Sequence, residues 1–255
     1  MIKTPEDVFE IIKKESSFDG VFSQDNKYDV IEPLNTCADL AGVDWTWDDG
    51  ASKLVLIFKD LDFVIKIPFT GYSEMSEYDH CEDCEEKSES HCANCPYHYN
   101  CYGDEENEYY DFEFASRDAT FERKWDYCET EAWLYQKAKD NGLEICFAET
   151  ALLGFVDGHP IYYQAKAQIY SDYYTSTRKS HTKEEKLNTE EACRRIEGWC
   201  FNVDWLTDFL FAFGDEMFQS FMAFIKTYGI KDLHSGNVGY VDEMPVLVDY
   251  SGYEG

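Results

Sequence analysis

Two acids and an asparagine near the carboxyl end of the sequence have the types and spacing needed to handle a metal-bound phosphate. Asp232 and Asn237 stand in one turn-like segment, and Asp249 directly follows the apolar run 245–248. One carboxylate can accept the proton of an attacking hydroxyl, whereas an amide oxygen and a second carboxylate are ligands that Mg²⁺ accepts. The segment therefore predicts a site for transfer of a phosphoryl group.

These residues also resemble the catalytic core of a known family. The segment Asp232-Leu233-His234-Ser235-Gly236-Asn237 has the D-x-x-x-x-N spacing of a kinase catalytic loop, and Asp249 stands like the metal-binding acid of D-F-G. The form D-L-H-x-G-N resembles the atypical branches (aminoglycoside, choline and lipopolysaccharide kinases) more than the H-R-D-L-K pattern. The resemblance implies an ATP- and Mg²⁺-dependent phosphotransferase with Asp232 as catalytic base and Asn237 and Asp249 as Mg²⁺ ligands. His234 is expected to fix the loop by a hydrogen bond.

The same resemblance gives a role to a lysine inside an apolar strand. Val64-Ile65-Lys66-Ile67 is similar to the kinase motif V-A-I-K, whose lysine contacts the nucleotide phosphates and pairs with a glutamate on the next helix. A buried lysine is costly unless its ammonium has a partner. We expect Glu131 rather than Glu129 to be that partner, although the spacing alone does not separate them.

Two further segments would complete a nucleotide site of this kind. The turn at 48–52 stands where kinases place a glycine-rich loop over the phosphates, but it contains one glycine, Gly50, so the pattern G-x-G-x-x-G is missing. Backbone groups at Gly50 and Ser52 are the expected phosphate contacts. Downstream, backbone groups of Gln164 to Lys166 are expected to bind the adenine edge.

A cysteine-rich insertion at 71–114 differs in composition from the rest of the chain. Between Glu74 and Phe114 there are fourteen acids and a single lysine, so this stretch has little apolar core of its own. Two C-x-x-C pairs have the spacing of a tetrahedral zinc site, and zinc binding would fold the segment. We predict a closed structural Zn²⁺ site, with Cys101 or His98 as alternatives for the fourth ligand and free surface cysteines as the competing interpretation. The predicted ligands are Cys81, Cys84, Cys92 and Cys95.

Hydrophobic periodicity predicts the elements that must position these residues. Alternating apolar residues and turn residues predict three strands between 44 and 68 and two more between 145 and 169, separated by a helix over 117–142. No prediction is made for 17–43. The remaining chain is predicted to form helices at 5–16, 190–200, 203–213 and 215–228, with a polar loop over 171–190.

Together these elements predict an α+β fold with a five-stranded antiparallel sheet and a reduced helical part. The resemblance implies that this is a protein-kinase-like fold of two lobes. Residues 1–42 would form an N-terminal helical extension, 43–169 the small lobe interrupted by the insertion, and 170–255 a reduced large lobe with the catalytic loop.

The charge of the chain limits its partners. Asp and Glu number 52 against 22 Lys and Arg, a formal net charge of −30, which would repel nucleic acid and anionic membranes. We expect this excess to serve solubility, and the alternatives are mimicry of nucleic acid or attraction to a basic protein. We find neither a signal peptide nor a run long enough to span a membrane. Ten cysteines in such a chain favour thiols or metal over disulfides. A cytoplasmic protein is expected, in the host cytoplasm if a virus encodes it.

The sequence departs from the kinase pattern after Asp249, which leaves the acceptor open. In Asp249-Tyr250-Ser251-Gly252 the glycine comes one place late, and no activation segment or substrate-binding helices follow. We expect a minimal atypical kinase, similar to compact kinases of phages and pathogenic bacteria, that modifies Ser or Thr of a partner protein or of itself. The alternatives are a small-molecule kinase or AMP transferase, and an inactive, acidic pseudokinase-like protein that occupies a basic site on a nucleic-acid-binding partner.

Overall fold

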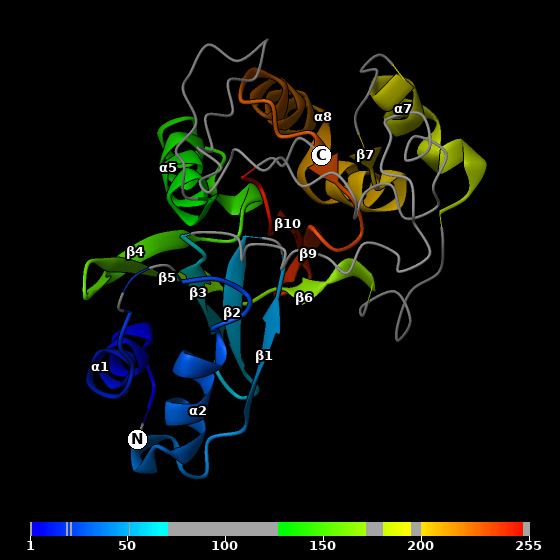
Figure 1. Ribbon diagram of the computed structural model, residues 1–255. Helices are drawn as coiled ribbons and strands as arrows, with labels where there is room; N and C mark the ends of the chain where they lie inside the picture. Colours follow the sequence, from blue (N-terminus) through cyan, green and yellow to red (C-terminus); the bar gives the residue numbers. More distant parts are fainter. Residues whose placement is uncertain are drawn as a thin grey trace, which may run out of the picture.

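The computed structural model shows an antiparallel five-stranded sheet with helices on both sides (Figure 1). The predicted α+β class and the five-stranded antiparallel sheet are therefore confirmed. The insertion at 71–114, with its four predicted zinc ligands, lies outside the described residues. The structure describes residues 2–18, 20, 22–50, 52–70, 127–171, 181–194 and 200–251.

The main sheet has the strand order β1-β2-β3-β5-β4, and every neighbouring pair is antiparallel. All five strands were predicted, with small differences at their ends. Asp157 and Gly158, both with positive φ, connect β4 to β5, a conformation that Asp-Gly turns adopt readily. The strands are β1 (Trp45–Asp49), β2 (Lys53–Phe58), β3 (Phe63–Pro68), β4 (Thr150–Val156) and β5 (His159–Ala165).

The N-terminal helices pack on one face of this sheet and share its hydrophobic core. They are α1 (Pro5–Glu15) and α2 (Tyr28–Thr36), followed by the 3-10 turn η1 (Ala38–Leu40). Helix α1 begins with a capping box, in which the hydroxyl of Thr4 accepts from the backbone N–H of Asp7 and the carboxylate of Asp7 accepts from the backbone N–H of Thr4. Alternate apolar residues of β2 and β3 point toward these helices, so the opposite face of the sheet is left for α5.

Within the described residues, the second part of the molecule contains three helices and five short strands around its own core. Strands β10, β9 and β6 form an antiparallel sheet in that order, and β7 pairs with β8 in parallel. The helices are α5 (Tyr127–Asp140), α7 (Lys183–Arg194) and α8 (Val203–Thr227), and the turn η2 (Glu144–Cys146) follows α5. The strands are β6 (Gln168–Ile169), β7 (Cys200–Phe201), β8 (Asp232–Leu233), β9 (Val238–Val241) and β10 (Met244–Leu247).

Helix α8 contains both helices that were predicted separately over 203–213 and 215–228. Gly214 lies between them with φ 79° and ψ 173°, outside helical geometry, so the two halves meet at a kink. A glycine is suited to this position because residues with a side chain rarely adopt a positive φ. The second half of α8 leads into the segment that contains Asp232.

The polar loop predicted over 171–190 is wrong in its second part. Helix α7 begins at Lys183 because Thr182 and Glu185 cap its first turn: the Thr182 N–H donates to Glu185 Oε2 at 2.7 Å, and the Glu185 N–H donates to Thr182 Oγ1 at 3.3 Å. Of the helix predicted over 190–200, residues 190–194 lie in α7, residues 195–199 lie outside the described residues, and Cys200 lies in β7.

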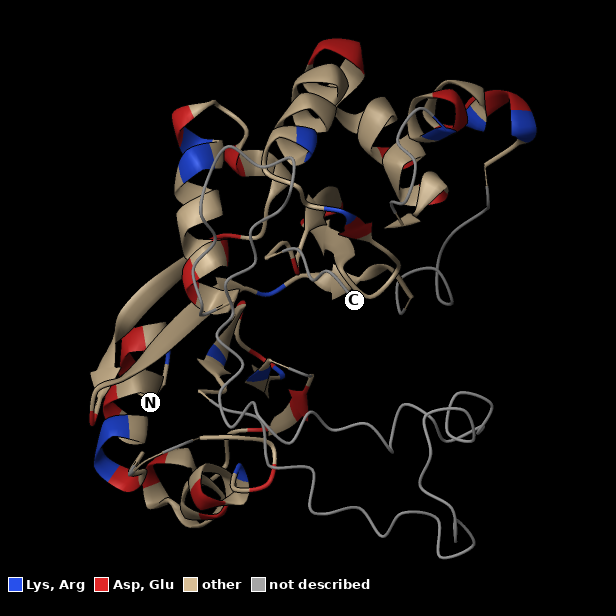
Figure 2. Ribbon diagram, turned by 45° about the horizontal axis from the view of Figure 1, so that its top comes forward, with Lys and Arg blue, Asp and Glu red and all other residues tan. Residues whose placement is uncertain are grey.

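Acidic residues are distributed over both parts of the molecule. Each of the helices α1, α2, α5, α7 and α8 carries at least one Asp or Glu, and these residues are seen in both parts (Figure 2). Within the described residues, no helix combines the length and the apolar character needed to cross a membrane.

Candidate functional site

Four charged side chains form a buried cluster where the main sheet meets α5 and the segment after β10. Lys66 Nζ lies 2.6 Å from Glu131 Oε2, and Lys53 Nζ lies 2.7 Å from Glu131 Oε1. Lys53 Nζ also lies 3.1 Å from Asp249 Oδ2. We call Lys53, Lys66, Glu131 and Asp249 the lysine–acid cluster. It joins three elements that are far apart in the sequence.

The register of the hairpin β2–β3 explains why both lysines reach the same acid. Val55 stands opposite Lys66 and Lys53 stands opposite Pro68, so the two lysines are diagonal neighbours on one face. Side chains alternate along a strand, and the residues between them, such as Leu54, point to the other face. The predicted contact of Lys66 with Glu131 is present in the structure.

Glu131 is brought to the lysines by the first turns of α5. Its side chain is 0% exposed, whereas those of Lys53 and Lys66 are 7% and 4% exposed, so the three charges satisfy one another away from water. Glu129, the alternative partner in the sequence analysis, is only half-buried. The roles of Lys66 and Glu131 in binding a nucleotide remain predictions.

Burial and opposite charges act against each other in this cluster. Burial raises the pKa of Glu131, although Lys53 and Lys66 oppose this effect. Burial would lower the pKa of Lys53, but Asp249 and Glu131 raise it well above its usual value. Asp249 is 37% exposed, and the two lysines outweigh its burial and hold its pKa well below the usual range. The cluster therefore keeps the carboxylate of Asp249 ionised at neutral pH.

Uncharged polar groups connect the cluster to strands β4 and β5. The side-chain amide of Gln164 donates to Thr150 Oγ1 and to the carbonyl of Val248, both at 2.8 Å. The hydroxyl of Tyr250 donates to the carbonyl of Ala148 at 2.8 Å. Because Val248 and Tyr250 flank Asp249, these bonds fix the backbone on both sides of that acid.

The predicted use of residues 164–166 for the adenine edge meets an obstacle. Gln164 lies inside β5 with its side chain turned toward the lysine–acid cluster. The backbone N–H groups of Ala165 and Lys166 already donate to the carbonyls of Glu149 and Asp62, at 2.8 and 2.7 Å. These two donors are therefore engaged within the fold.

Asp232 and Asn237 lie on a tight loop beside the segment of Asp249. Asn237 Nδ2 donates to the main-chain oxygen of Asp232 at 2.9 Å, and the main-chain oxygen of Asn237 accepts from the N–H groups of Val248 and Asp249 at 2.8 and 3.3 Å. The structure thus brings Asn237 and Asp249 onto adjacent, hydrogen-bonded segments.

The carboxylate of Asp232 is half-buried at the start of β8. Its Oδ2 lies 3.6 Å from His234 Nε2. The predicted loop-fixing role of His234 has a physical basis, because His234 Nδ1 accepts from the Gly236 N–H at 2.9 Å. In the described part of the chain, no ion pair joins Asp232 to the lysine–acid cluster.

Side chains of the N-terminal segment hold the turn between β1 and β2 in place. The Gly50 N–H donates to the carbonyl of Lys53 at 3.2 Å, and the carbonyl of Gly50 accepts from Gln24 Nε2 at 2.7 Å. Lys27 Nζ contacts both carboxylate oxygens of Asp49 at 2.9 Å. A phosphate that used the Gly50 amide would have to replace an existing hydrogen bond. For Ser52, the main-chain carbonyl accepts from the Phe69 N–H at 2.8 Å.

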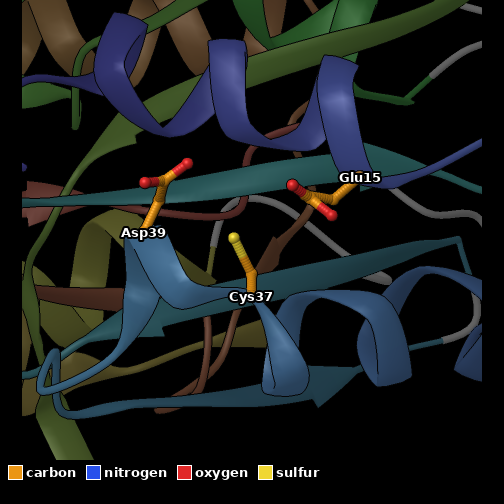
Figure 3. Close-up of side chains that lie close together, drawn as sticks. All are labelled: Glu15, Cys37 and Asp39. Carbon is orange, nitrogen blue, oxygen red and sulfur yellow. The ribbon is translucent and has the colours of Figure 1, made fainter.

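A second group of possible metal ligands lies at the N-terminal helices, outside the lysine–acid cluster. One ligand atom from each of Glu15, Cys37 and Asp39 lies within 4.8 Å of the others (Figure 3). Lys14 Nζ, however, already lies 2.8 Å from Glu15 and 3.1 Å from Asp39, so one ammonium group bridges both carboxylates. The arrangement is explained by this ion pair.

Lys53 is the site residue that sequence reasoning did not identify. Lys53 is the first residue of a strand after a turn, a position at which an exposed side chain is expected. It has no counterpart in the V-A-I-K motif. The available signal was the register: a hairpin turn over 59–62 pairs β2 with β3 so that Lys53 falls on the face of Lys66. Gln164 and Thr150 offered a similar signal as polar residues in otherwise apolar strands.

Comparisons with protein-family models, with curated proteins and with solved structures found no match to this chain.

Proposed function

We propose that this protein is an ATP- and Mg²⁺-dependent phosphotransferase, a minimal atypical protein kinase that modifies Ser or Thr of a partner protein or of itself. The observation that carries the proposal is the buried contact of Lys66 with Glu131, which Lys53 extends to Asp249. Lys66 in the kinase-like motif, Glu131 on α5 and Asp249 after the hairpin β9–β10 lie far apart in the sequence. Their assembly into one cluster supports a shared site. The cysteine pairs of the insertion remain proposed ligands of a structural Zn²⁺.

The arrangement of elements supports a kinase-like fold of two lobes. The main sheet has the order β1-β2-β3-β5-β4. In the chain, α5 is the next described element after β3, where kinases have the helix that carries the lysine's partner. In the helical part, Asp232 follows α8 and Asp249 follows the hairpin β9–β10. Shared architecture alone does not establish activity, so the proposal depends on the side chains.

Mg²⁺ fits the groups that are available beside the cluster. Asp249 keeps a low pKa and is partly exposed, so it offers an anionic oxygen, and Asn237 offers an amide oxygen from the adjacent segment. When bound, Mg²⁺ would neutralise the charge on the phosphate oxygens of ATP. Lys66, held in position by Glu131, would contact those phosphates directly.

In the proposed reaction, Asp232 accepts a proton from the attacking hydroxyl. The hydroxyl oxygen forms a bond to the γ-phosphorus, the bond between that phosphorus and the bridging β–γ oxygen breaks, and ADP leaves. Asp232 is suited to this role because its carboxylate is half-buried on a loop that hydrogen bonds fix at His234 and Asn237. No covalent enzyme intermediate is required, so catalysis would consist of positioning and charge neutralisation.

The test is incubation with γ-labelled ATP and Mg²⁺, alone and with a cell lysate, followed by autoradiography and intact mass. We expect labelled protein with wild type and a loss of roughly 100-fold or more with Asp232→Asn, because a general base contributes about that much. The matched control is Asp242→Asn, an acid in the β9–β10 turn whose positive φ asparagine also tolerates.

Two other outcomes would redirect the proposal. A mass increase of adenylate would indicate AMP transfer, and labelled small molecules in the lysate would indicate a small-molecule kinase. Absence of any label, together with no effect of ATP on thermal stability, would contradict a phosphotransferase. The net charge of −30 would then favour the second candidate, an acidic protein that binds a basic partner, which a pulldown with and without ATP would detect.

A further inference from the structure

Lys53 makes the contacts of a site residue although no motif includes it. Its Nζ lies between two acids from different elements, 2.7 Å from Glu131 Oε1 and 3.1 Å from Asp249 Oδ2, and its side chain is 7% exposed. We propose that Lys53 is a second nucleotide-binding residue that contacts the phosphates of ATP together with Lys66. This inference rests on the function proposed above, because it assigns a further role within the same site.

The position of Lys53 places it next to the proposed cation site. Because its Nζ is 3.1 Å from Asp249 Oδ2, a group that bound at Asp249 would lie beside the ammonium of Lys53. An ammonium has three donors, and the two contacts with Glu131 and Asp249 use two of them. Among the described residues no third contact of this ammonium is seen, so one N–H is left for an anionic oxygen.

The charge balance of the cluster depends on Lys53. Lys53 and Lys66 carry two positive charges, which balance the negative charges of Glu131 and Asp249. Without Lys53 the cluster would be left with a net negative charge, and at these degrees of burial it would repel a triphosphate more strongly than in water. Lys53 therefore removes a net negative charge that would oppose the binding of phosphates.

The turn that precedes Lys53 explains why a second lysine is needed. A glycine-rich loop binds phosphates through several free backbone N–H groups. Here the turn has one glycine, and its N–H donates to the carbonyl of Lys53. Gln24 and Lys27 hold the same turn in place from the N-terminal segment. Because the Gly50 N–H is engaged in this way, a side-chain ammonium at the first residue of β2 can supply a donor in its place.

A purely structural role for Lys53 makes a different prediction from a phosphate contact. A structural counter-ion would affect the binding of adenosine, AMP and ATP to the same extent, since it would act through the shape of the site. A phosphate contact would matter more as the number of phosphates rises. The dependence on phosphate number therefore separates the two roles.

The experiment measures the affinities of adenosine, AMP, ADP and ATP, with Mg²⁺, for wild type, Lys53→Met, Lys66→Met and the control Lys27→Met. Lys27 suits as the control because it also forms a half-buried ion pair beside the β1–β2 turn, but with Asp49. We expect Lys53→Met to weaken ATP roughly tenfold or more while adenosine changes less than about twofold, as for loss of a charged hydrogen bond. Lys27→Met should change all four ligands equally.

Variants with other side chains keep the test decisive if Lys53→Met does not fold. Lys53→Gln retains a donor toward Glu131 without the charge, and Lys53→Arg retains the charge and should keep most of the ATP affinity. Equal losses for adenosine and ATP, or no loss, in the Lys53 variants would overturn the inference while a selective loss in Lys66→Met leaves the proposed function intact. If wild type binds none of the four ligands, the proposed function fails and the inference fails with it.

Discussion

Glu131 accepts hydrogen bonds from two ammonium groups, and only one of these contacts could be predicted from the sequence. Lys66 belongs to a motif-like segment and lies inside an apolar strand, so its need for a partner was visible. Lys53 opens a strand, and its place on the inner face depends on the pairing of β2 with β3. A motif describes residues that are close in the chain, whereas the second lysine is defined by the register of a sheet.

His159 is a buried titratable residue outside this cluster, and it makes stability depend on pH. Its ring stacks on Phe18 with centroids 4.5 Å apart. Burial lowers its pKa from 6.5 to about 4, although a hydrogen bond with the backbone of Pro68 opposes this. Between these two values the unfolded chain binds a proton that the folded protein does not, so stability falls as the pH falls from 6.5 toward 4.

We expect wild type to lose about 2 kcal/mol more than His159→Phe between pH 7.5 and pH 5 in urea unfolding, from this shift by proton linkage. Phenylalanine keeps a flat ring against Phe18 but cannot take up a proton. Because all other titrating groups are shared, the difference between the two proteins isolates His159. Parallel pH profiles for the two proteins would show that His159 is not held neutral by the fold.

At the scale of elements, the five strands of the main sheet were predictable and helix α7 was not. The apolar alternation of β2 and β3 reflects burial of one face, which periodicity detects directly. Helix α7 has one fully buried residue, Thr189, whose hydroxyl lies 2.8 Å from that of Thr207 on α8. A helix that buries so little apolar surface has a weak periodic signal, and it depends on its cap and on contacts with α8.

The small sheet β10-β9-β6 depends on a close approach at Gly239. A methyl group at this position would lie 2.5 Å from the backbone oxygen of Gln168 in β6. The carbonyl of Gly239 also accepts from Trp205 Nε1 at 3.0 Å, which ties this sheet to α8. Because the obstacle is backbone and not a flexible side chain, the strands would have to separate.

We expect Gly239→Ala to lower the free energy of unfolding by about 2 kcal/mol or more, as overpacking against a fixed neighbour does. The matched change Gly50→Ala has no atom within 4 Å of the added methyl group and should stay within about 1 kcal/mol of wild type. Chemical denaturation followed by tryptophan fluorescence measures both. Equal stabilities of the two variants would contradict the tight pairing of β6 with β9.

At the scale of the whole molecule, the lysine–acid cluster joins two hydrophobic cores. One core contains α1, α2 and the main sheet, and the other contains α5, α8 and the strands β9 and β10. Lys53 and Lys66 come from the first part, whereas Glu131 and Asp249 come from elements of the second. The candidate site therefore lies where the two cores meet. A substitution that disrupts the cluster should weaken the association of the two cores.

We expect Glu131→Gln to lower the free energy of unfolding by about 3 kcal/mol, because it leaves two buried ammonium groups with one acid. The control Glu129→Gln, two residues earlier on the same helix and half-buried, should cost about 1 kcal/mol or less. Urea titration measures both, and a shallower transition in Glu131→Gln would show that the two parts have begun to unfold separately. Equal effects of the two variants would mean that Glu131 is not the shared partner of the lysines.

The joining of Lys53 to Asp249 also has a consequence for how the chain reaches its folded state. These contacts connect residues whose numbers, 53 and 249, differ by 196, and the bond of Tyr250 to Ala148 spans 102 residues. Closing so long a loop costs conformational entropy before the contact contributes any stabilisation. Folds with many contacts between residues distant in the sequence therefore fold slowly. The hairpins β1–β2–β3 and β4–β5 and helix α8 can form early from local contacts, the pairing of β3 with β5 must follow, and the ion cluster has to assemble last. Conditions that slow this last step would accumulate a compact chain with both cores formed and no site between them.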